Sequence, residues 1–285
     1  MANLEKIELG DVATTGLFTL YCHAIESKSK NPMLKDPKAV EIVGELNKVL
    51  SKSDKKLDKI MVKEKIKKMM VATIAIRAKR FDQYVTDFLN ENPNGVVVNM
   101  GCGLDSRFSR IDNGKVVFYD LDLPEMIEIK KQFYKETLRY HLIGCSVLDH
   151  KWMNLISKEK GPFLFMAEGL FMYLDQKDVE ELVLTFQKRF PDSDLVCEVF
   201  NSFWLKKPFK KMINFKLRRE FHFGNVSFNF GIRNSNEMEQ WNKGIKFLDE
   251  WCYFDANEKK LGLLNLLGKF DVFRKTQWTV HYRLN

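Results

Sequence analysis

Residues 96–105 read VVVNMGCGLD, a largely apolar run that leads directly into two glycines, Gly101 and Gly103. A run of this length and composition is typical of a strand that is buried on both faces of a parallel sheet. Glycines at its end let the backbone turn sharply into a helix and approach a ligand closely. The stretch therefore predicts an α/β sheet with a ligand-binding loop at the end of its first strand.

The chain alternates between helix-like and strand-like segments around this loop. Helices are predicted, the first from an apolar period of about 3.6 residues, over the ranges 63–90, 125–138 and 176–189. Further strands are predicted over the ranges 115–120, 140–145, 163–168 and 194–200. Because strands that alternate with helices form right-handed βαβ units, we predict a doubly wound parallel sheet with helices on both faces. Residues 270–273 and 277–284 are expected to close it as an antiparallel hairpin.

Composition and charge argue against several classes of protein. The chain has 285 residues, of which 45% are apolar, and this favours a globular fold. No apolar run approaches the roughly 20 residues of a membrane span, and the N-terminus lacks a signal-peptide pattern, so we expect neither a membrane protein nor a secreted one. The net charge of +8 arises largely from a lysine-rich segment that also carries acids. Such a segment indicates a solvated face rather than a nucleic-acid surface.

The five cysteines are far apart and include no C-x-x-C pair. This spacing predicts neither a metal site nor a disulfide framework. We therefore expect a cytoplasmic protein without a bound metal.

Carboxylates follow at the ends of two later strands. Asp120 and Asp122 lie about 20 residues after the glycines, where a carboxylate can bind both hydroxyls of a ribose. Asp122 also precedes Leu123-Pro124, so capping of the next helix is its alternative role. Glu168 ends the strand at 163–168 and would face the same crevice, with an ordinary surface position as the alternative. Together these acids predict a nucleotide-like ligand beyond the carboxyl edge of the sheet.

Arg77 lies on the apolar side of the first predicted helix. A buried guanidinium needs an anionic partner, which is either a ligand carboxylate or a protein acid such as Glu168 or Asp105. The loop lacks the third glycine of a dinucleotide fingerprint, because Ser106 stands in its place. A nicotinamide-dependent oxidoreductase is thereby disfavoured.

Five motifs, in this order, resemble the leucine carboxyl methyltransferase family and its bacterial branch of tetracenomycin polyketide O-methyltransferases. They are LKDPKA (34–39), IRAKRFD (76–82), NMGCGLDSR (99–107), YDLDLP (119–124) and AEGLFMYL (167–174). The resemblance implies an enzyme that uses S-adenosylmethionine and releases S-adenosylhomocysteine. It also implies a Rossmann-like class I methyltransferase fold, a seven-stranded, mostly parallel sheet with an antiparallel last strand, N-terminal helices and a lid insertion.

The resemblance assigns roles to the residues that bind the cofactor. By the family's pattern, Arg77 holds the methionine carboxylate of the cofactor, and Gly101 and Gly103 pass beneath its amino-acid part. Asp122, with Asp120 as a second candidate, binds the ribose.

Further roles follow from the later motifs. Glu168 corresponds to the acid at the cofactor's amino end, and Tyr173 corresponds to a tyrosine that positions the methyl-transfer centre. Ser146 and Val147 are the expected adenine contacts. His23 stands where family members often carry a basic residue before an alanine, so a second clamp on the cofactor carboxylate is left open.

We expect one methyltransferase domain with four parts. These are an N-terminal helical cap, a cofactor-binding core, a substrate lid insertion and C-terminal strands that complete the sheet, at residues 1–92, 93–200, 201–245 and 246–285. The lid segment is aromatic and basic, and its candidates for steering an anionic acceptor are Arg218, Arg219 and Arg233.

The expected reaction is an in-line displacement that methylates a carboxylate or hydroxyl of a small-molecule acceptor. A carboxylate is already ionised at neutral pH and needs no base, whereas a phenol needs one, and His222 is the candidate for that role. A protein C-terminus is the alternative acceptor. A noncatalytic cofactor-binding protein and a nicotinamide-dependent oxidoreductase are the alternatives from other classes. We expect no nucleic-acid or membrane partner, and the sequence leaves the oligomeric state open.

Overall fold

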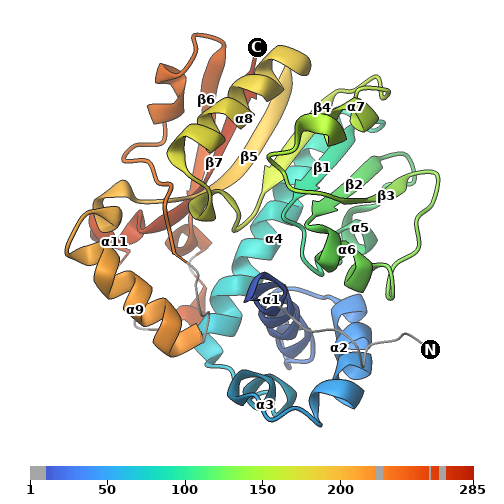
Figure 1. The fold of residues 1–285 in the computed structure, drawn as a ribbon, viewed down its shortest axis with the longest axis vertical. Helices are drawn as coiled ribbons and strands as arrows, with labels where there is room; N and C mark the ends of the chain where they lie inside the picture. Colours follow the sequence, from blue (N-terminus) through green and yellow to red (C-terminus); the bar gives the residue numbers. More distant parts are fainter. Residues whose placement is uncertain (1–10, 222–226, 257, 263–267) are drawn as a thin grey trace.

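The computed structural model describes residues 11–221, 227–256, 258–262 and 268–285. A single seven-stranded sheet runs through its centre, in the order β3-β2-β1-β4-β5-β7-β6 (Figure 1). The strands are β1 (Val96–Met100), β2 (Val117–Asp122), β3 (Tyr140–Gly144), β4 (Phe163–Ala167), β5 (Ser193–Phe200), β6 (Ile245–Cys252) and β7 (Gln277–Leu284). Strands β1 to β5 pair in parallel, and β7 is antiparallel to both β5 and β6. The predicted class I methyltransferase sheet is thus confirmed.

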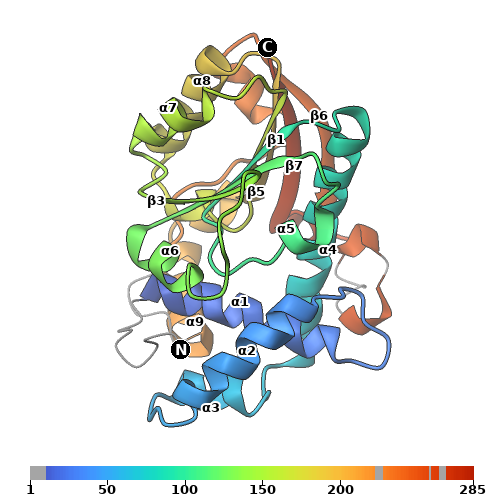
Figure 2. The same cartoon turned by 90° about the vertical axis from the view of Figure 1, so that its right-hand side faces the viewer.

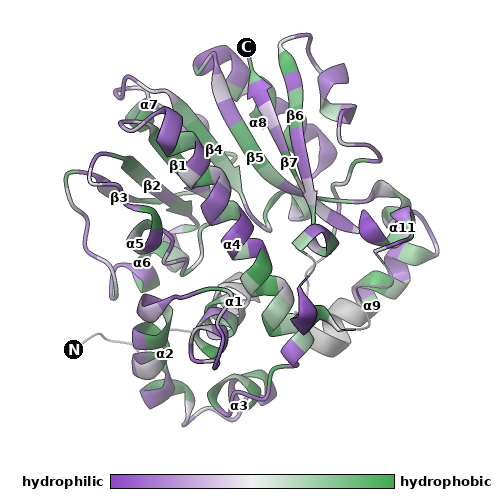
Figure 3. Ribbon diagram, turned by 180° about the vertical axis from the view of Figure 1, so that it is seen from behind, coloured by the Kyte–Doolittle hydropathy of each residue, from purple (hydrophilic) through white to green (hydrophobic). Residues whose placement is uncertain are grey.

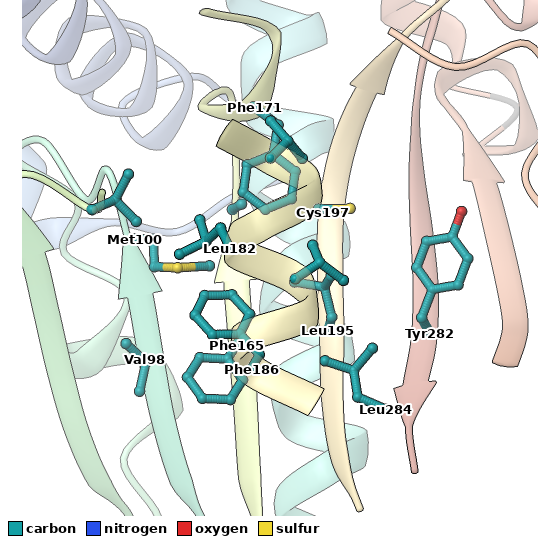
Figure 4. Close-up of a cluster of buried hydrophobic side chains, with 14 of the residues drawn as sticks. Val98, Met100, Phe165, Phe171, Leu182, Phe186, Leu195, Cys197, Tyr282 and Leu284 are labelled. Atoms are coloured by element: carbon teal, nitrogen blue, oxygen red, sulfur yellow. The ribbon is translucent and has the colours of Figure 1, made fainter. Parts of the chain in front are cut away.

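Helices cover both faces of the sheet because alternate strand residues point to opposite sides. On one face, Val98 packs with α7 and α8, and on the other Val97 packs with α4. Figure 4 shows the first of these cores, in which the rings of Phe165 and Phe186 stack with centroids 4.3 Å apart. The helices of these layers are α4 (Lys68–Glu91), α5 (Phe108–Ile111), α6 (Pro124–Lys130), α7 (Met153–Ile156) and α8 (Gln176–Arg189). In Figure 3 the central strands are largely green and the surrounding turns mostly purple, as expected for a buried sheet.

Three N-terminal helices lie together beside the sheet, as Figure 2 shows, and their buried side chains form a second, smaller core. They are α1 (Asp11–Ser27), α2 (Pro37–Leu50) and α3 (Lys56–Val62). The Asp36 side chain caps α2 by accepting a hydrogen bond from the backbone N–H of Ala39, and Pro37 occupies the first turn. Helix α1 crosses the carboxyl edge of the sheet, where Gly16 lies against the loop that follows β1.

Most of the remaining short elements fall between β5 and β7 in the sequence. They are η2 (His150–Trp152), η3 (Phe171–Tyr173), η4 (Ser202–Leu205), α9 (Phe209–Phe221), η5 (Glu237–Gln240), η6 (Tyr253–Ala256), η7 (Lys259–Leu261) and α11 (Asp271–Arg274). Within the described ranges, no helix combines the length and the apolar character that a membrane crossing requires.

Two predictions about the local structure are wrong. Residues 271–274 form helix α11 rather than a strand, and the antiparallel neighbours of β7 are β5 and β6. The alternating pattern of β6 is weak because this strand lies at the sheet edge and exposes most of its middle. Helix α6 ends at Lys130 rather than at residue 138. Phe133 and Tyr134 still pack against the core beyond its end, whereas Leu138 is 96% exposed.

Candidate cofactor and acceptor site

A cavity of about 710 Å³ lies at the carboxyl edge of the sheet, beneath α1 and α4. The strand order reverses between β1 and β4, and crevices at such points are where open α/β sheets bind ligands. The loops that follow β1, β2, β3 and β4 all contribute to its wall. Every predicted site residue except Asp120 lines this cavity: Arg77, Gly101, Gly103, Asp122, Ser146, Val147, Glu168 and Tyr173.

The glycine loop, which follows β1, requires glycine at both Gly101 and Gly103. Gly101 has a φ of +65°, and a Cβ there would lie 3.0 Å from Cδ1 of Leu170. Gly103 has a φ of +49°, and a Cβ there would lie 3.3 Å from the Cα of Gly16. The loop is fastened to β2, because the Gly103 N–H donates to Oδ2 of Asp122 at 2.7 Å. The loop backbone therefore lies close to the cavity in a conformation that other residues adopt at a cost.

Replacing Gly101 with alanine should lower the free energy of unfolding by more than the same change at Gly114. Both positions have positive φ, which costs a non-glycine residue about 1–2 kcal/mol, but a Cβ at Gly114 meets nothing within 4 Å. The difference between the two variants, measured by urea denaturation, isolates the crowding against Leu170. Equal losses would contradict a packed glycine loop.

The two carboxylates at the end of β2 have different surroundings. Asp122 lines the cavity and accepts hydrogen bonds from the backbone N–H groups of Gly103 and Leu123, each at 2.7 Å. It makes no capping bond to α6, so the alternative role is not the one observed. Burial raises the pKa of Asp122, although the hydrogen bonds from the two backbone N–H groups act to lower it. Each carboxylate oxygen keeps a lone pair that a ligand hydroxyl can use.

Asp120 lies behind the cavity wall rather than in it. It is 1% exposed and accepts hydrogen bonds from Asn99 at 2.8 Å and from Tyr140 at 2.6 Å. Its ion pair with Nζ of Lys130, at 2.8 Å, attaches α6 to the sheet. The prediction that Asp120 shares the ribose site is therefore corrected: its oxygens are occupied within the protein.

A buried ion network supports the floor of the cavity. Arg107 is 1% exposed, and its guanidinium donates to Asp82, Asp105 and Glu168 at 2.6, 2.7 and 2.6 Å. Burial opposes ionisation of Asp105 and Glu168, but the facing cations outweigh it and hold the pKa of both below the usual range. Glu168 is thereby kept ionised at the cavity edge.

Arg77 reaches the cavity from α4 and meets two acids there. Its Nε donates to Oε1 of Glu168 at 2.7 Å, and its Nη1 donates to Oε2 of Glu198 at 3.1 Å. The protein-acid alternative for Arg77 is thus observed, with Glu198 as an additional partner. Gly169 lies beside this contact with a φ of +67°, a backbone conformation that other residues adopt at a cost.

His23 presents an unpartnered nitrogen at the cavity. Its Nδ1 lies 3.2 Å from Oδ2 of Asp36, and its Nε2 has no hydrogen-bond partner although the residue is only 2% exposed. Because a carboxylate only accepts hydrogen bonds, Nδ1 carries a proton and Nε2 is free for a ligand.

These features fit S-adenosylmethionine. Asp122 suits a ribose diol, and the apolar side chain of Val147 suits an adenine face. The acids around the cavity and its floor outnumber the guanidiniums, which favours a ligand with an ammonium and a sulfonium. The acids are Asp36, Asp82, Asp105, Glu168 and Glu198, against Arg77, Arg107 and Arg110.

The other end of the cavity is apolar and aromatic. Its wall over β4, β5 and β7 includes Met172, Tyr173, Phe228, Tyr253 and Gln277. The ring of Tyr173 meets the edge of Phe228 with centroids 5.3 Å apart, and burial raises the pKa of Tyr173 to about 12. The Tyr173 hydroxyl therefore stays protonated at neutral pH and can donate a hydrogen bond.

Of the lid residues named from the sequence, Arg233 is the one whose side chain the structure describes. Arg233 lies over the ring of Phe203 and is not part of the cavity wall. His222 falls outside the described residues, and so do the side chains of Arg218 and Arg219.

Sequence reasoning missed three polar residues at this end of the cavity. Glu198 had a signal, since it is an acid within the apolar run LVCEVF. No sequence pattern indicated Tyr253 and Gln277, because the long-range pairing of β7 with β5 and β6 brings them to the cavity.

Comparisons with known proteins agree with this geometry. The sequence profile of leucine carboxyl methyltransferases matches residues 17–187. The chain is 28% identical over 253 residues to the tetracenomycin polyketide synthesis O-methyltransferase TcmP of Streptomyces glaucescens, with 88% of this chain and 87% of that protein covered. It is 23% identical over 283 residues to the S-adenosyl-L-methionine-dependent methyltransferase dpfgK of Gibberella zeae, with 96% and 92% covered.

A solved structure supports the fold alone. The crystal structure of a DUF574 family protein from Streptomyces avermitilis superposes with a TM-score of 0.54 at 10% identity, covering 93% of this chain and 97% of that one. With the sequence matches, it follows that the chain belongs to the leucine carboxyl methyltransferase family and is an S-adenosylmethionine-dependent methyltransferase.

Proposed function

We propose that this enzyme methylates an oxygen of a small-molecule acceptor with an apolar, ring-containing body. The observation that carries the proposal is that one cavity joins the polar cofactor end to an end walled by Met172, Tyr173 and Phe228. One relative, whose name describes polyketide synthesis O-methylation, supports the same acceptor class. A protein C-terminus is the second candidate, because another relative is a leucine carboxyl methyltransferase 1 of Caenorhabditis elegans.

We propose that the predicted residues hold the cofactor by their chemistry. Asp122 accepts from the ribose hydroxyls, while Ser146 and Val147 contact the adenine. Glu168 and Arg77 face the ammonium and carboxylate of the methionine part. When bound, the cofactor supplies a methyl group activated by a positively charged sulfur. The protein's contribution is to hold the acceptor oxygen in line with that methyl group, and we assign this positioning to Tyr173.

We further propose that residues 201–245 act as the lid over the acceptor. Phe228 and Asn229 from this segment line the cavity, and the backbone N–H of Asn229 donates to the carbonyl of Met172 at 2.8 Å. The helices of residues 1–92 act as the cap over the cofactor. The free cysteines favour a reducing cytoplasm as the location.

The test is methyl transfer from labelled S-adenosylmethionine into an extract of the source organism. We expect the label in the small-molecule fraction, because Met172, Tyr173 and Phe228 give the acceptor end an apolar, aromatic wall that suits a ring-containing body. Label confined to protein would replace this proposal with C-terminal carboxyl methylation. Tight S-adenosylhomocysteine binding without any transfer would instead indicate a noncatalytic cofactor-binding protein.

A further inference from the structure

Among the residues that the structure describes, the acceptor end of the cavity has no charged side chain in its wall. The ionisable side chains that line the cavity belong to its cofactor end, and they include Arg77, Asp105, Arg107, Asp122 and Glu168. The acceptor end is walled by neutral side chains instead, such as Met172, Ser227 and Asn229. An ionic group on the acceptor would therefore need a partner just beyond this wall.

Lys210 of α9 lies directly beside this neutral wall. Helix α9 packs against the wall through Ile213, which contacts the buried cluster that contains Met172 and Phe228. Lys210 lies three residues before Ile213 and hence on the same side of the helix. Its Nζ donates to Oδ1 of Asn229 at 3.1 Å, and Asn229 itself lines the cavity. The Lys210 ammonium is thereby held at the rim of the acceptor end.

The ammonium of Lys210 has donors to spare. A lysine ammonium has three N–H groups, and the contact with Asn229 uses one of them. Within the described part of the chain, Lys210 forms no ion pair with an acid, and neither do its neighbours Lys206, Lys207 and Lys211. Uncompensated positive charge of this kind attracts anionic ligands and raises their local concentration.

Helix stability does not explain the lysines at the start of α9. The amino end of a helix carries the positive end of the helix dipole, so cations in the first turn are unfavourable there. Helix α9 nevertheless begins at Phe209 with Lys210 and Lys211 next, and it has no acid in its first turn. A role in binding accounts for cations at this place, whereas a role in stabilising the helix does not.

Building on the proposed function, we propose that the acceptor is an organic anion and that Lys210 determines this specificity. The Lys210 Nζ donates to an anionic oxygen of the acceptor, while the apolar body of the acceptor lies against Met172, Tyr173 and Phe228. The three neighbouring lysines add to the positive potential at the rim. The anionic group is either the carboxylate that becomes methylated or a second acidic group, since an ammonium binds both by the same charge-assisted hydrogen bond.

The test uses the full-length protein and the small molecules of the source organism's extract. These are split on an anion-exchange resin at neutral pH into a retained, anionic fraction and an unretained one. Each fraction receives labelled S-adenosylmethionine, and we expect the wild type to label the retained fraction. A product that no longer binds the resin would identify the methylated carboxylate as the anionic group, and a product that is still retained would identify a second acidic group. Both results support the inference.

Variants of Lys210 test the assigned residue, at dilutions where the rate of label transfer is proportional to kcat/KM. Lys210→Gln can still donate to Asn229 but has lost its charge, so the rate should fall about 10- to 100-fold. Lys210→Arg stays cationic and should remain within about threefold of the wild type. The dissociation constant of S-adenosylhomocysteine should change by less than about threefold in both variants, because no hydrogen bond to the cofactor is lost.

Lys246→Gln is the matched control for the loss of one positive charge. Lys246 is also an exposed lysine, but it lies on β6 and does not line the cavity. Its rate should equal that of the wild type. Replacing Lys206, Lys207 and Lys211 together by glutamine should make the rate less sensitive to ionic strength than the wild-type rate is, because salt screens the attraction that these lysines provide.

Four results would overturn the inference. These are an acceptor found only in the unretained fraction, a Lys210→Gln variant as fast as the wild type, a Lys210→Arg variant as slow as Lys210→Gln, and a Lys210→Gln variant that loses affinity for S-adenosylhomocysteine along with its rate. A wild-type protein that methylates no small molecule in either fraction would contradict the proposed function itself, which keeps the two failures apart.

Discussion

Replacing Arg107 with alanine is expected to lower the free energy of unfolding by about 3–5 kcal/mol. The guanidinium is buried and donates to three acids, Asp82, Asp105 and Glu168. Its removal takes away the one cation that all three acids share and leaves Arg110 with Asp82 and Asp105, and Arg77 with Glu168. A buried acid that loses a charged partner is costly. The measurement is chemical denaturation at neutral pH, followed by circular dichroism.

Arg139 offers the matched control for this variant. Its guanidinium also pairs with an aspartate, Asp112, but the pair lies at the surface with side chains 33% and 28% exposed. Water replaces such a partner readily, so Arg139→Ala should cost far less than Arg107→Ala. Equal losses would show that the network beneath the cavity is not held by Arg107.

Replacing Asp122 with alanine is expected to raise the dissociation constant of S-adenosylhomocysteine by about 100-fold or more, since hydrogen bonds to a charged group contribute about 1.5–3 kcal/mol each. The side chain is the proposed ribose ligand, and it also fastens the glycine loop through the N–H of Gly103. Both effects act on the same ligand, and calorimetry measures their sum.

Asp120→Asn separates the two carboxylates that the sequence offered for the ribose. This variant weakens the ion pair with Lys130 and should lower the stability of the protein. It should leave the dissociation constant of S-adenosylhomocysteine within about threefold of the wild type, because no hydrogen bond to the ligand is lost. A large loss of affinity in Asp120→Asn with little change in Asp122→Ala would reverse the assignment.

The sequence was most informative where the determinants are local. A run of apolar residues followed by Gly101 and Gly103 specifies a buried strand and a tight loop within a few residues, and both are found as predicted. The sequence alone did not show which of Asp120 and Asp122 lines the cavity. Both point to the same side of β2, but Asp120 pairs in register with Asn99 of β1, whereas Asp122 extends past the end of β1. That difference in depth depends on the neighbouring strands.

The acceptor end was the least predictable part of the site. Tyr253 and Gln277 enter it through an antiparallel arrangement in which β7 lies between β5 and β6. This pairing joins segments far apart in the chain, and the weak pattern of β6 gave no sign of it. The partners of Arg77 were likewise undecided, because Glu168 and Glu198 lie 91 and 121 residues away from it in sequence.

The order of the last strands has a consequence for how the chain folds during synthesis. Strand β6 leaves the ribosome before β7, yet its only strand partner within the described sheet is β7. For the time needed to make the intervening residues, β6 is an open edge without hydrogen-bonded neighbours, a state prone to pairing with other chains. The residues that separate β6 from β7 thus set the length of the interval in which the nascent protein most needs a chaperone.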